Sequence, residues 1–247
     1  MSRESLHWFG VSDVAAPVCI VTERERSGEW VEKMSRSTVP DGGVYPTVVG
    51  DLGGRTVAVI QRVSPAYLRD ALHYAREQLS CRRALFVGTG GTLSGSVGDF
   101  VLIGSAGTVD EHRGTVRERV SASWGEDRLH RLAAGLAARE GNAGSVVTIG
   151  TAATVPGVSW ESADRLAALR DAGVDMVTMD TAHFYAACRA AGVDGLALQW
   201  ATDAPLTEAF VWGYADATRQ RELEEARRGA WRALPEVALF VARAFDG

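Results

Sequence analysis

The chain has 247 residues, of which 46% are hydrophobic and 23% are charged, and its formal net charge is −5. This length suits one α/β domain with a sizeable core, and we predict a single domain over residues 1–247. The acidic balance argues against a nucleic acid or an anionic membrane as the main partner. We find no apolar stretch long enough to cross a bilayer and no secretion signal, so we expect a cytoplasmic protein.

The three cysteines, Cys19, Cys81 and Cys188, are odd in number and widely spaced. Cys19 lies in an apolar strand pattern and Cys188 in a helical one. This spacing is typical of buried free thiols and does not indicate a disulfide framework or a metal site.

Segments with strand and helix patterns alternate along the chain. Strands are predicted at 17–21, 44–49, 56–61, 84–87, 101–104, 145–149, 176–178 and 195–200. Helices are predicted at 65–79, 127–139, 162–172 and 180–191, followed by a helical tail at 216–244 that breaks at Pro235. Residues 106–126 and 151–161 are predicted to be loops. This alternation predicts a parallel or mixed sheet with helices on both faces.

Polar and glycine residues follow three of the predicted strands. The strand at 84–87 leads into Gly88-Thr89-Gly90-Gly91, which we predict to be a tight turn, and two later strands end near Asp180 and Asp203. In open α/β sheets, small-molecule sites form beyond the strand ends, where glycine lets the backbone approach a ligand. Each feature also has a purely structural interpretation, as a loop turn, a helix cap or a turn before Pro205.

In combination these motifs carry a resemblance to a known family. The Gly-Thr-Gly-Gly segment, followed by Val-Gly-Asp-Phe-Val at 97–101, resembles the purine nucleoside and uridine phosphorylase superfamily. The segments Thr178-Met179-Asp180 and Thr202-Asp203 lie where members carry Glu-Met-Glu and Ser-Asp, and residues 6–11 resemble the opening of the hexameric uridine phosphorylases. The resemblance implies an α/β nucleoside phosphorylase-like fold with a central mixed, barrel-like β-sheet flanked by helices. It also implies a homodimer or homohexamer.

The resemblance implies a role for several single residues at the sugar. Asp180 matches the carboxylate that binds the two ribose hydroxyls, and Met179 matches the methionine that packs under the sugar. Thr89 matches a residue that contacts both phosphate and ribose, and His7 matches a histidine that a neighbouring subunit contributes to the 5′ end. A carboxylate suits vicinal hydroxyls because each of its oxygens can accept one proton.

Other matches concern the base and the acceptor. Asp203 matches the aspartate that protonates a purine at N7, a form of general acid catalysis. Gly90 and Arg26 match phosphate-binding positions, whereas Glu23 or Glu25 could activate water as a glutamate does in the hydrolytic branch.

The chain also departs from the phosphorylase pattern. Phe86 replaces an arginine, and Glu23 would repel a phosphate dianion unless it were paired. We expect an enzyme that cleaves or reversibly forms the N-glycosidic bond of a purine-type nucleoside, with phosphate as a co-substrate and no metal or organic cofactor. Two alternatives stay open. One is a hydrolytic nucleosidase, and the other is a divergent nucleoside-binding protein or specialised-metabolism enzyme without phosphorolysis.

Overall fold

The structure, a computed structural model, describes residues 8–11, 14–140, 147–207 and 217–246. The strands are β1 (Val18–Thr22), β2 (Ser35–Thr38), β3 (Thr47–Asp51), β4 (Thr56–Ile60), β5 (Arg83–Thr92), β6 (Phe100–Val109), β7 (Val116–Ser121), β8 (Val147–Thr154), β9 (Met176–Thr178) and β10 (Asp194–Asp203). The α-helices are α2 (Ser27–Lys33), α3 (Leu68–Gln78), α4 (Glu126–Glu140), α5 (Ala163–Asp171), α6 (Thr181–Ala191) and α7 (Ala217–Arg243). Short 3-10 helices cover Pro65–Tyr67 (η1), Val158–Trp160 (η2) and Ala244–Asp246 (η3).

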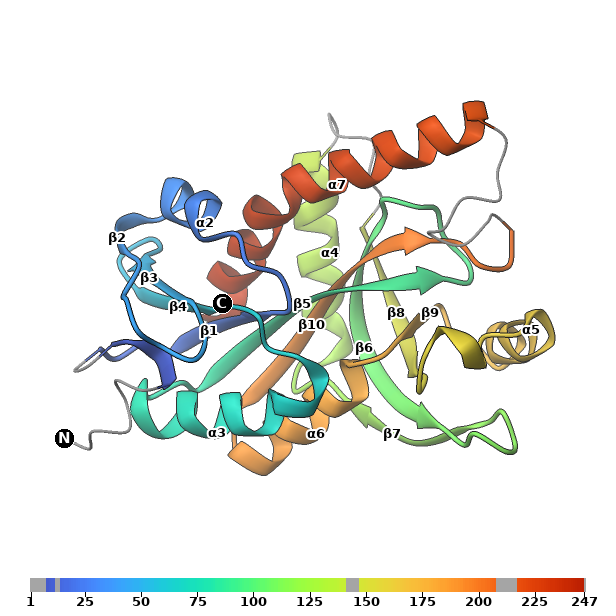
Figure 1. Ribbon diagram of the computed structural model, residues 1–247, viewed down its shortest axis with the longest axis horizontal. Coiled ribbons are helices and arrows are strands. Elements are labelled where there is room, and N and C mark those ends of the chain that lie inside the picture. Colours follow the sequence, from blue (N-terminus) through green and yellow to red (C-terminus); the bar gives the residue numbers. More distant parts are fainter. Residues whose placement is uncertain (1–7, 12–13, 141–146, 208–216, 247) are drawn as a thin grey trace.

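Five strands close into a small barrel (Figure 1). Around the ring, β5 pairs in parallel with β10, β10 antiparallel with β6, β6 in parallel with β8, β8 in parallel with β9, and β9 antiparallel with β5. On the other side of β5, the sheet continues through β1, β4, β3 and β2. The predicted mixed, barrel-like sheet is therefore confirmed.

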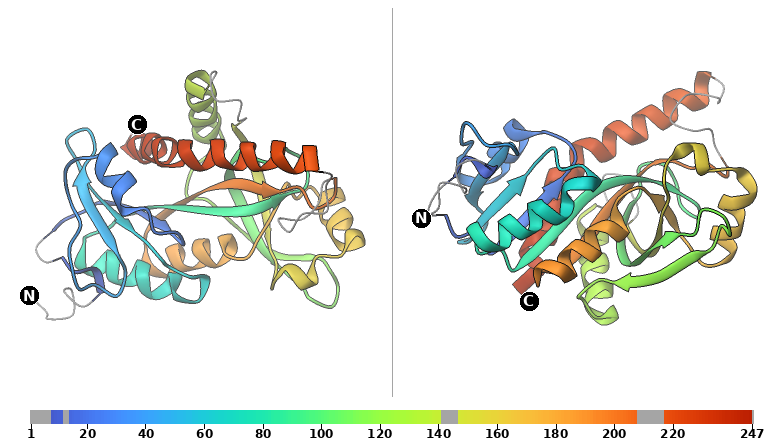
Figure 2. Two further views of the ribbon diagram at one scale, coloured as in Figure 1. Left: turned by 45° about the horizontal axis from the view of Figure 1, so that its top comes forward. Right: turned by 60° about the horizontal axis from the view of Figure 1, so that its bottom comes forward.

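Helices cover both faces of the sheet. In Figure 2, α7 runs along one face, where it contacts β1, β5 and β10, while α3 and α6 pack against each other on the opposite face. Apolar side chains of both helices are buried. They include Leu68 and Leu72 of α3 and Phe184 of α6, which stacks on Phe86 of β5 with ring centroids 5.2 Å apart. The predicted alternation of strands and helices thus encloses one large core.

Four details of the predicted elements are wrong. The Gly88–Gly91 segment is no turn, because β5 continues through it to Thr92. Residues 106–126 contain the end of β6 and all of β7, and β8 extends to Thr154 inside the predicted 151–161 loop. Small residues and threonines hide these strands in the sequence, but barrel pairing of 105–108 with 151–154 stabilises them. Pro235 lies inside a continuous α7, where apolar residues on both sides of it are buried.

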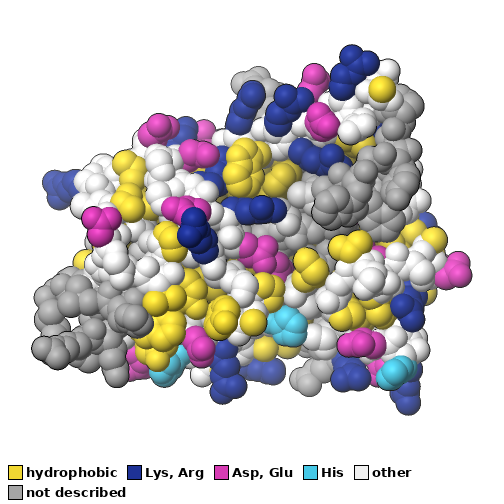
Figure 3. All heavy atoms as spheres, viewed as in Figure 1, with side chains coloured by type: hydrophobic (Ala, Val, Ile, Leu, Met, Phe, Trp, Pro, Cys, Tyr) yellow, Lys and Arg dark blue, Asp and Glu magenta, His cyan; other side chains and the backbone are white. Residues whose placement is uncertain are grey.

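The face of the molecule shown in Figure 3 carries side chains of both charges. Asp and Glu side chains are interspersed there with Lys and Arg side chains. Within the described ranges, no helix is both long and apolar enough to span a bilayer.

Candidate active site

The glycines of β5 allow three strands to approach one another closely. A Cβ atom at Gly88 would lie 2.7 Å from Oε1 of Gln199 on β10, and one at Gly90 would lie 2.6 Å from the carbonyl oxygen of Val177 on β9. At Gly90 the obstructing atom belongs to the backbone, so this position requires glycine. At Gly88 the nearest atom is at the end of the Gln199 side chain, which would have to move to admit a Cβ atom. The Gly88–Gly91 segment therefore serves first to let neighbouring strands pack closely. Thr89 lies between two of its glycines.

A cavity of about 300 Å³ opens beside this part of β5. Its wall is formed by Arg24, Thr89, Gly90, Gly91, Val158, Glu161, Val177, Thr178, Met179, Thr202 and Asp203. Of the predicted site residues, it brings together Thr89, Gly90, Met179 and Asp203. Met179 is 50% exposed, which is unusual for a large apolar side chain and leaves its thioether available to a ligand.

Asp203 ends β10 and is only 7% exposed. The Thr202 hydroxyl donates a hydrogen bond of 3.0 Å to Oδ1 of Asp203, and Nε of Arg227 donates one of 2.5 Å to the Thr202 carbonyl. Burial raises the pKa of Asp203, while the Thr202 hydrogen bond and the charge of Arg227 oppose that rise. Arg219, also on α7, donates a hydrogen bond of 2.8 Å from Nη1 to Glu222 at the exposed surface.

Glu161 and Arg24 are charged residues of this wall that the sequence did not predict as site residues. Glu161 is the acid of the two. It follows η2 and is half-buried. Burial raises its pKa to about 7, and the charge of Asp203 contributes to the rise. The one signal in the sequence is its position in the predicted 151–161 loop, because long loops in such folds often border the site.

Asp180 lies next to the cavity and not in its wall. It is 3% exposed, and its Oδ1 accepts hydrogen bonds from the Thr181 hydroxyl (3.1 Å) and from Nε2 of Gln199 (3.3 Å). Burial raises the pKa of Asp180 to about 8, and the charge of Glu23, together with a hydrogen bond between the two carboxyls, adds to the rise. Burial likewise raises the pKa of Glu23, against the charge of Arg24. The buried Asp180 and the half-buried Glu23 therefore form an acid pair, and Asp180 directly follows Met179 in the chain.

The Asp180 carboxylate does not cap α6, although its position before the helix invites that role. Two threonines do so instead: the Thr154 hydroxyl accepts from N–H of Ala182 at 2.9 Å, and the Thr178 hydroxyl accepts from N–H of Thr181 at 3.4 Å. The helix-cap interpretation of Asp180 is therefore wrong, and its burial has no explanation in helix capping.

The two arginines of the first loop point to different places. Arg24 lines the cavity, whereas the predicted phosphate residue Arg26 is 6% exposed and lies with its guanidinium 3.8 Å from the ring centre of Trp231. Arg26 also pairs with Glu29, and burial lowers its pKa. The structure does not bring Arg26 to the cavity. His7 lies outside the described residues.

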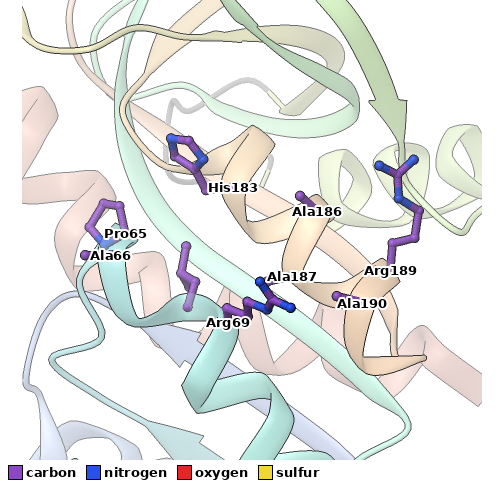
Figure 4. Close-up of a pocket in the computed structure, with 9 residues that line it drawn as sticks. Pro65, Ala66, Arg69, His183, Ala186, Ala187, Arg189 and Ala190 are labelled. Carbon is purple, nitrogen blue, oxygen red and sulfur yellow. The ribbon is translucent and has the colours of Figure 1, made fainter.

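A larger hollow of about 720 Å³ lies between α3 and α6 (Figure 4). Alanines of α6 form much of its wall, together with Arg69, His183 and Arg189. Figure 4 shows Arg69 between the two helices and Arg189 pointing away from α3. None of the predicted site residues lines this groove.

The fold and the cavity define a class of protein: a mixed α/β barrel with a cavity beside β5 whose wall includes two carboxyl groups. The chain belongs to the phosphorylase superfamily, whose family model matches residues 22–235. Members of this superfamily are pentosyltransferases or N-glycosyl hydrolases. The comparison with curated proteins gave no match.

Solved structures share the fold at low identity. Uridine phosphorylase from Vibrio fischeri ES114 is 14% identical, with a TM-score of 0.71 and 96% of each chain covered. Purine nucleoside phosphorylase from Schistosoma mansoni in complex with adenosine is 18% identical, with a TM-score of 0.68 over 95% of this chain and 92% of that one. The 5′-methylthioadenosine/S-adenosylhomocysteine nucleosidase from Neisseria meningitidis is 16% identical, with a TM-score of 0.67, covering 92% of this chain and 98% of that one.

Proposed function

We propose that the protein cleaves, or reversibly forms, the N-glycosidic bond of a purine-type nucleoside. The observation that carries this proposal is one cavity walled by Thr89, Met179 and Asp203. Asp180, the neighbour of Met179 in the chain, pairs with Glu23. Desolvated carboxyl groups in a small cavity are suited to proton transfer near neutral pH. Membership of the superfamily supports the reaction class, and the purine preference is our inference from the acidic end of the cavity.

In this proposal the cavity has a sugar end and a base end. Met179 packs against the sugar, and Asp180 accepts its hydroxyls once they displace Glu23. Both protein donors to Asp180 contact Oδ1, so the other oxygen is the one available to a sugar hydroxyl. The leaving base lies toward Asp203 and Glu161, where an acid protonates it as the sugar develops oxocarbenium character. Thr89 and Gly90 hold the acceptor.

The acceptor is phosphate or water, and Glu23 favours water as a second candidate. Glu23 sits against Asp180 and Arg26 lies on Trp231, so the anionic group is near the sugar and the predicted phosphate arginine is away from it. Arg24 supports the phosphate alternative, because it is an arginine of the cavity wall. The third alternative is a nucleoside-binding protein without turnover. Such a protein would bind a nucleoside and release no free base.

Product analysis separates these alternatives. The protein is incubated with inosine, adenosine or methylthioadenosine, with and without inorganic phosphate, and free base is quantified by chromatography. Release of base only with phosphate identifies a phosphorylase, and release without phosphate identifies a nucleosidase. Thermal stabilisation by a nucleoside with no release identifies the binding protein, and the absence of both would refute the proposal.

We also propose that the working unit is a homodimer, or a hexamer built from dimers, as the family resemblance implies. Exposed apolar side chains at the cavity mouth, Met179 and Val158, support a partner near this opening. Light scattering after size exclusion tests the assembly, and a monomer with full activity would contradict it.

A further inference from the structure

We propose that Glu161, and not Asp203, carries the proton that passes to the leaving base, and that Asp203 acts as its ionised partner. This inference rests on the proposed function. It reverses the role that the family resemblance gives to Asp203, and it assigns a catalytic role to a residue that no motif in the sequence marks.

The first step of the argument is geometric. Glu161, at the end of η2, and Asp203, at the end of β10, belong to the wall of the same 300 Å³ cavity. Two carboxyl groups in one small, poorly hydrated cavity do not both ionise readily, because like charges repel strongly where water is excluded. At neutral pH such a pair therefore tends to retain one proton, and the surroundings of each acid decide which of them holds it.

The surroundings favour the anion at Asp203. Its Oδ1 accepts the Thr202 hydroxyl at 3.0 Å, and the cationic Arg227 is anchored close by through the Thr202 carbonyl. Hydrogen bonds and positive charge stabilise a carboxylate over the neutral acid. Asp203 is thus held in the ionised form even though it is the more buried of the two acids.

Glu161 lacks such support. Among the residues that the structure describes, no side chain donates a hydrogen bond or an ion pair to its carboxyl, and only its backbone N–H is engaged, with Val158. Its burial and the charge of Asp203 place its pKa at about 7. The retained proton therefore belongs to Glu161, at the pKa best suited to giving it away near neutral pH.

Other charged groups near this end of the cavity do not change the assignment. Arg24 belongs to the same wall, and Arg165 of the following helix is engaged with Trp160, donating from Nη1 to its carbonyl at 3.1 Å. The Asp180–Glu23 pair is a separate couple, and the charge of Arg24 acts on Glu23, whose pKa it lowers. Thr202 and Arg227 lower the pKa of Asp203.

The chemical step balances. The C1′–N bond breaks and its electron pair stays with the base, while the Glu161 carboxyl proton moves to a ring nitrogen of the base. C1′ then bonds to an oxygen of phosphate or water. With either acceptor, the attacking water or hydrogen phosphate loses one proton to solvent. Glu161 regains one proton from solvent after the base departs, so the protons balance.

Two reciprocal variants and two substrates test the proposal. Glu161→Gln should lower kcat on the cleaved nucleoside by about 100-fold or more at every pH, because the proton donor is gone. It should lower kcat on 4-nitrophenyl β-D-ribofuranoside much less, by roughly threefold or less, since that leaving group departs without a proton. Asp203→Asn should keep activity at low pH and move the descending limb of the pH profile to lower pH. Asp194→Asn is the matched control, because Asp194 lies at the opposite, exposed end of β10. It should change neither kcat nor the position of the descending limb.

The opposite pattern would overturn the assignment: loss at every pH in Asp203→Asn with only a displaced profile in Glu161→Gln. A titration of side-chain carboxyls by ¹³C NMR gives a reading independent of turnover, with the Glu161 resonance identified by its absence in Glu161→Gln. Glu161 should titrate near neutral pH in the wild type and at lower pH in Asp203→Asn, and titration of Glu161 below Asp203 would refute the proposal. If neither substrate is cleaved by the wild type, the proposed function fails, whereas the titration still decides which acid holds the proton.

Discussion

The cavity at the strand ends and the groove between α3 and α6 differ in size and in chemistry. The groove is the larger, at about 720 Å³ against 300 Å³, but its polar side chains, Arg69, His183 and Arg189, are exposed to solvent. The smaller cavity has Asp203 almost fully buried and Glu161 half-buried in its wall, with raised pKa values. Acid catalysis needs titratable groups removed from water, so desolvated carboxyls identify a reactive site better than volume does.

The largest expected effect comes from Asp180, next to the smaller cavity. Asp180→Asn should lower kcat/KM by roughly 100-fold, because the amide oxygen would keep the hydrogen bonds from Thr181 and Gln199, and an NH₂ donor would replace the oxygen that is available to a sugar hydroxyl. Steady-state kinetics on the cleaved nucleoside measures this. An unchanged kcat/KM would remove Asp180 from the sugar site and leave the Asp180–Glu23 pair without a function.

A backbone substitution tests the close strand approach that builds the cavity. Gly90→Ala would place a Cβ atom 2.6 Å from the Val177 carbonyl, so the free energy of unfolding should fall by about 2–4 kcal/mol as the strands separate. Gly28→Ala is the matched control: no atom lies within 4 Å of its Cβ position in α2, and alanine there should raise stability by about 0.5–1 kcal/mol. Urea denaturation compares the two, and equal effects would contradict the packing argument.

The acid pair should also make stability depend on pH. The pKa of Asp180 rises from its ordinary 3.8 to about 8 on folding, so its contribution is full below about pH 4 and is lost as the pH rises through 8. Asp180→Asn should remove this loss and raise the free energy of unfolding at pH 9 by roughly 2 kcal/mol. Urea midpoints measured from pH 5 to 9 test it, and parallel curves for the two proteins would show that Asp180 is ionised throughout.

Arg24 and Arg26 allow a cavity residue to be compared with a residue that packs in the structure. Arg26→Ala should lower the free energy of unfolding by about 1–3 kcal/mol, because Arg26 packs on Trp231, while changing kcat/KM by less than about threefold. Arg24→Ala should leave stability within about 0.5 kcal/mol and, if phosphate is the acceptor, raise the KM for phosphate about tenfold. The reverse pattern would return the phosphate role to Arg26.

The sequence was sufficient for the architecture and for part of the cavity. The alternation of strands and helices predicted the mixed sheet, and the motif resemblance placed Thr89, Gly90, Met179 and Asp203 in one wall. Positions just beyond strand ends are predictable in this way, because topology fixes where those ends meet.

The missed features depend on long-range contacts. Nothing local distinguishes Arg24 from Arg26 or indicates that Arg26 stacks on Trp231, 205 residues later in the chain. Glu161 gains significance only from the proximity of Asp203, and the glycines of β5 extend a strand because β9 and β10 flank them. Each of these outcomes is set by tertiary packing, which overrides the local turn and charge patterns.

The smallest effect is expected in the larger groove. Arg189→Ala removes a cation from its wall, yet Arg189 is exposed and points away from α3, so we expect kcat/KM to change by less than about twofold and stability by less than about 0.5 kcal/mol. Measuring this variant beside Asp180→Asn places one substitution in each region under the same assay. A loss of activity in Arg189→Ala comparable with that of Asp180→Asn would mean that the groove takes part in turnover. The buried carboxyls of the smaller cavity would then mark only part of the active site.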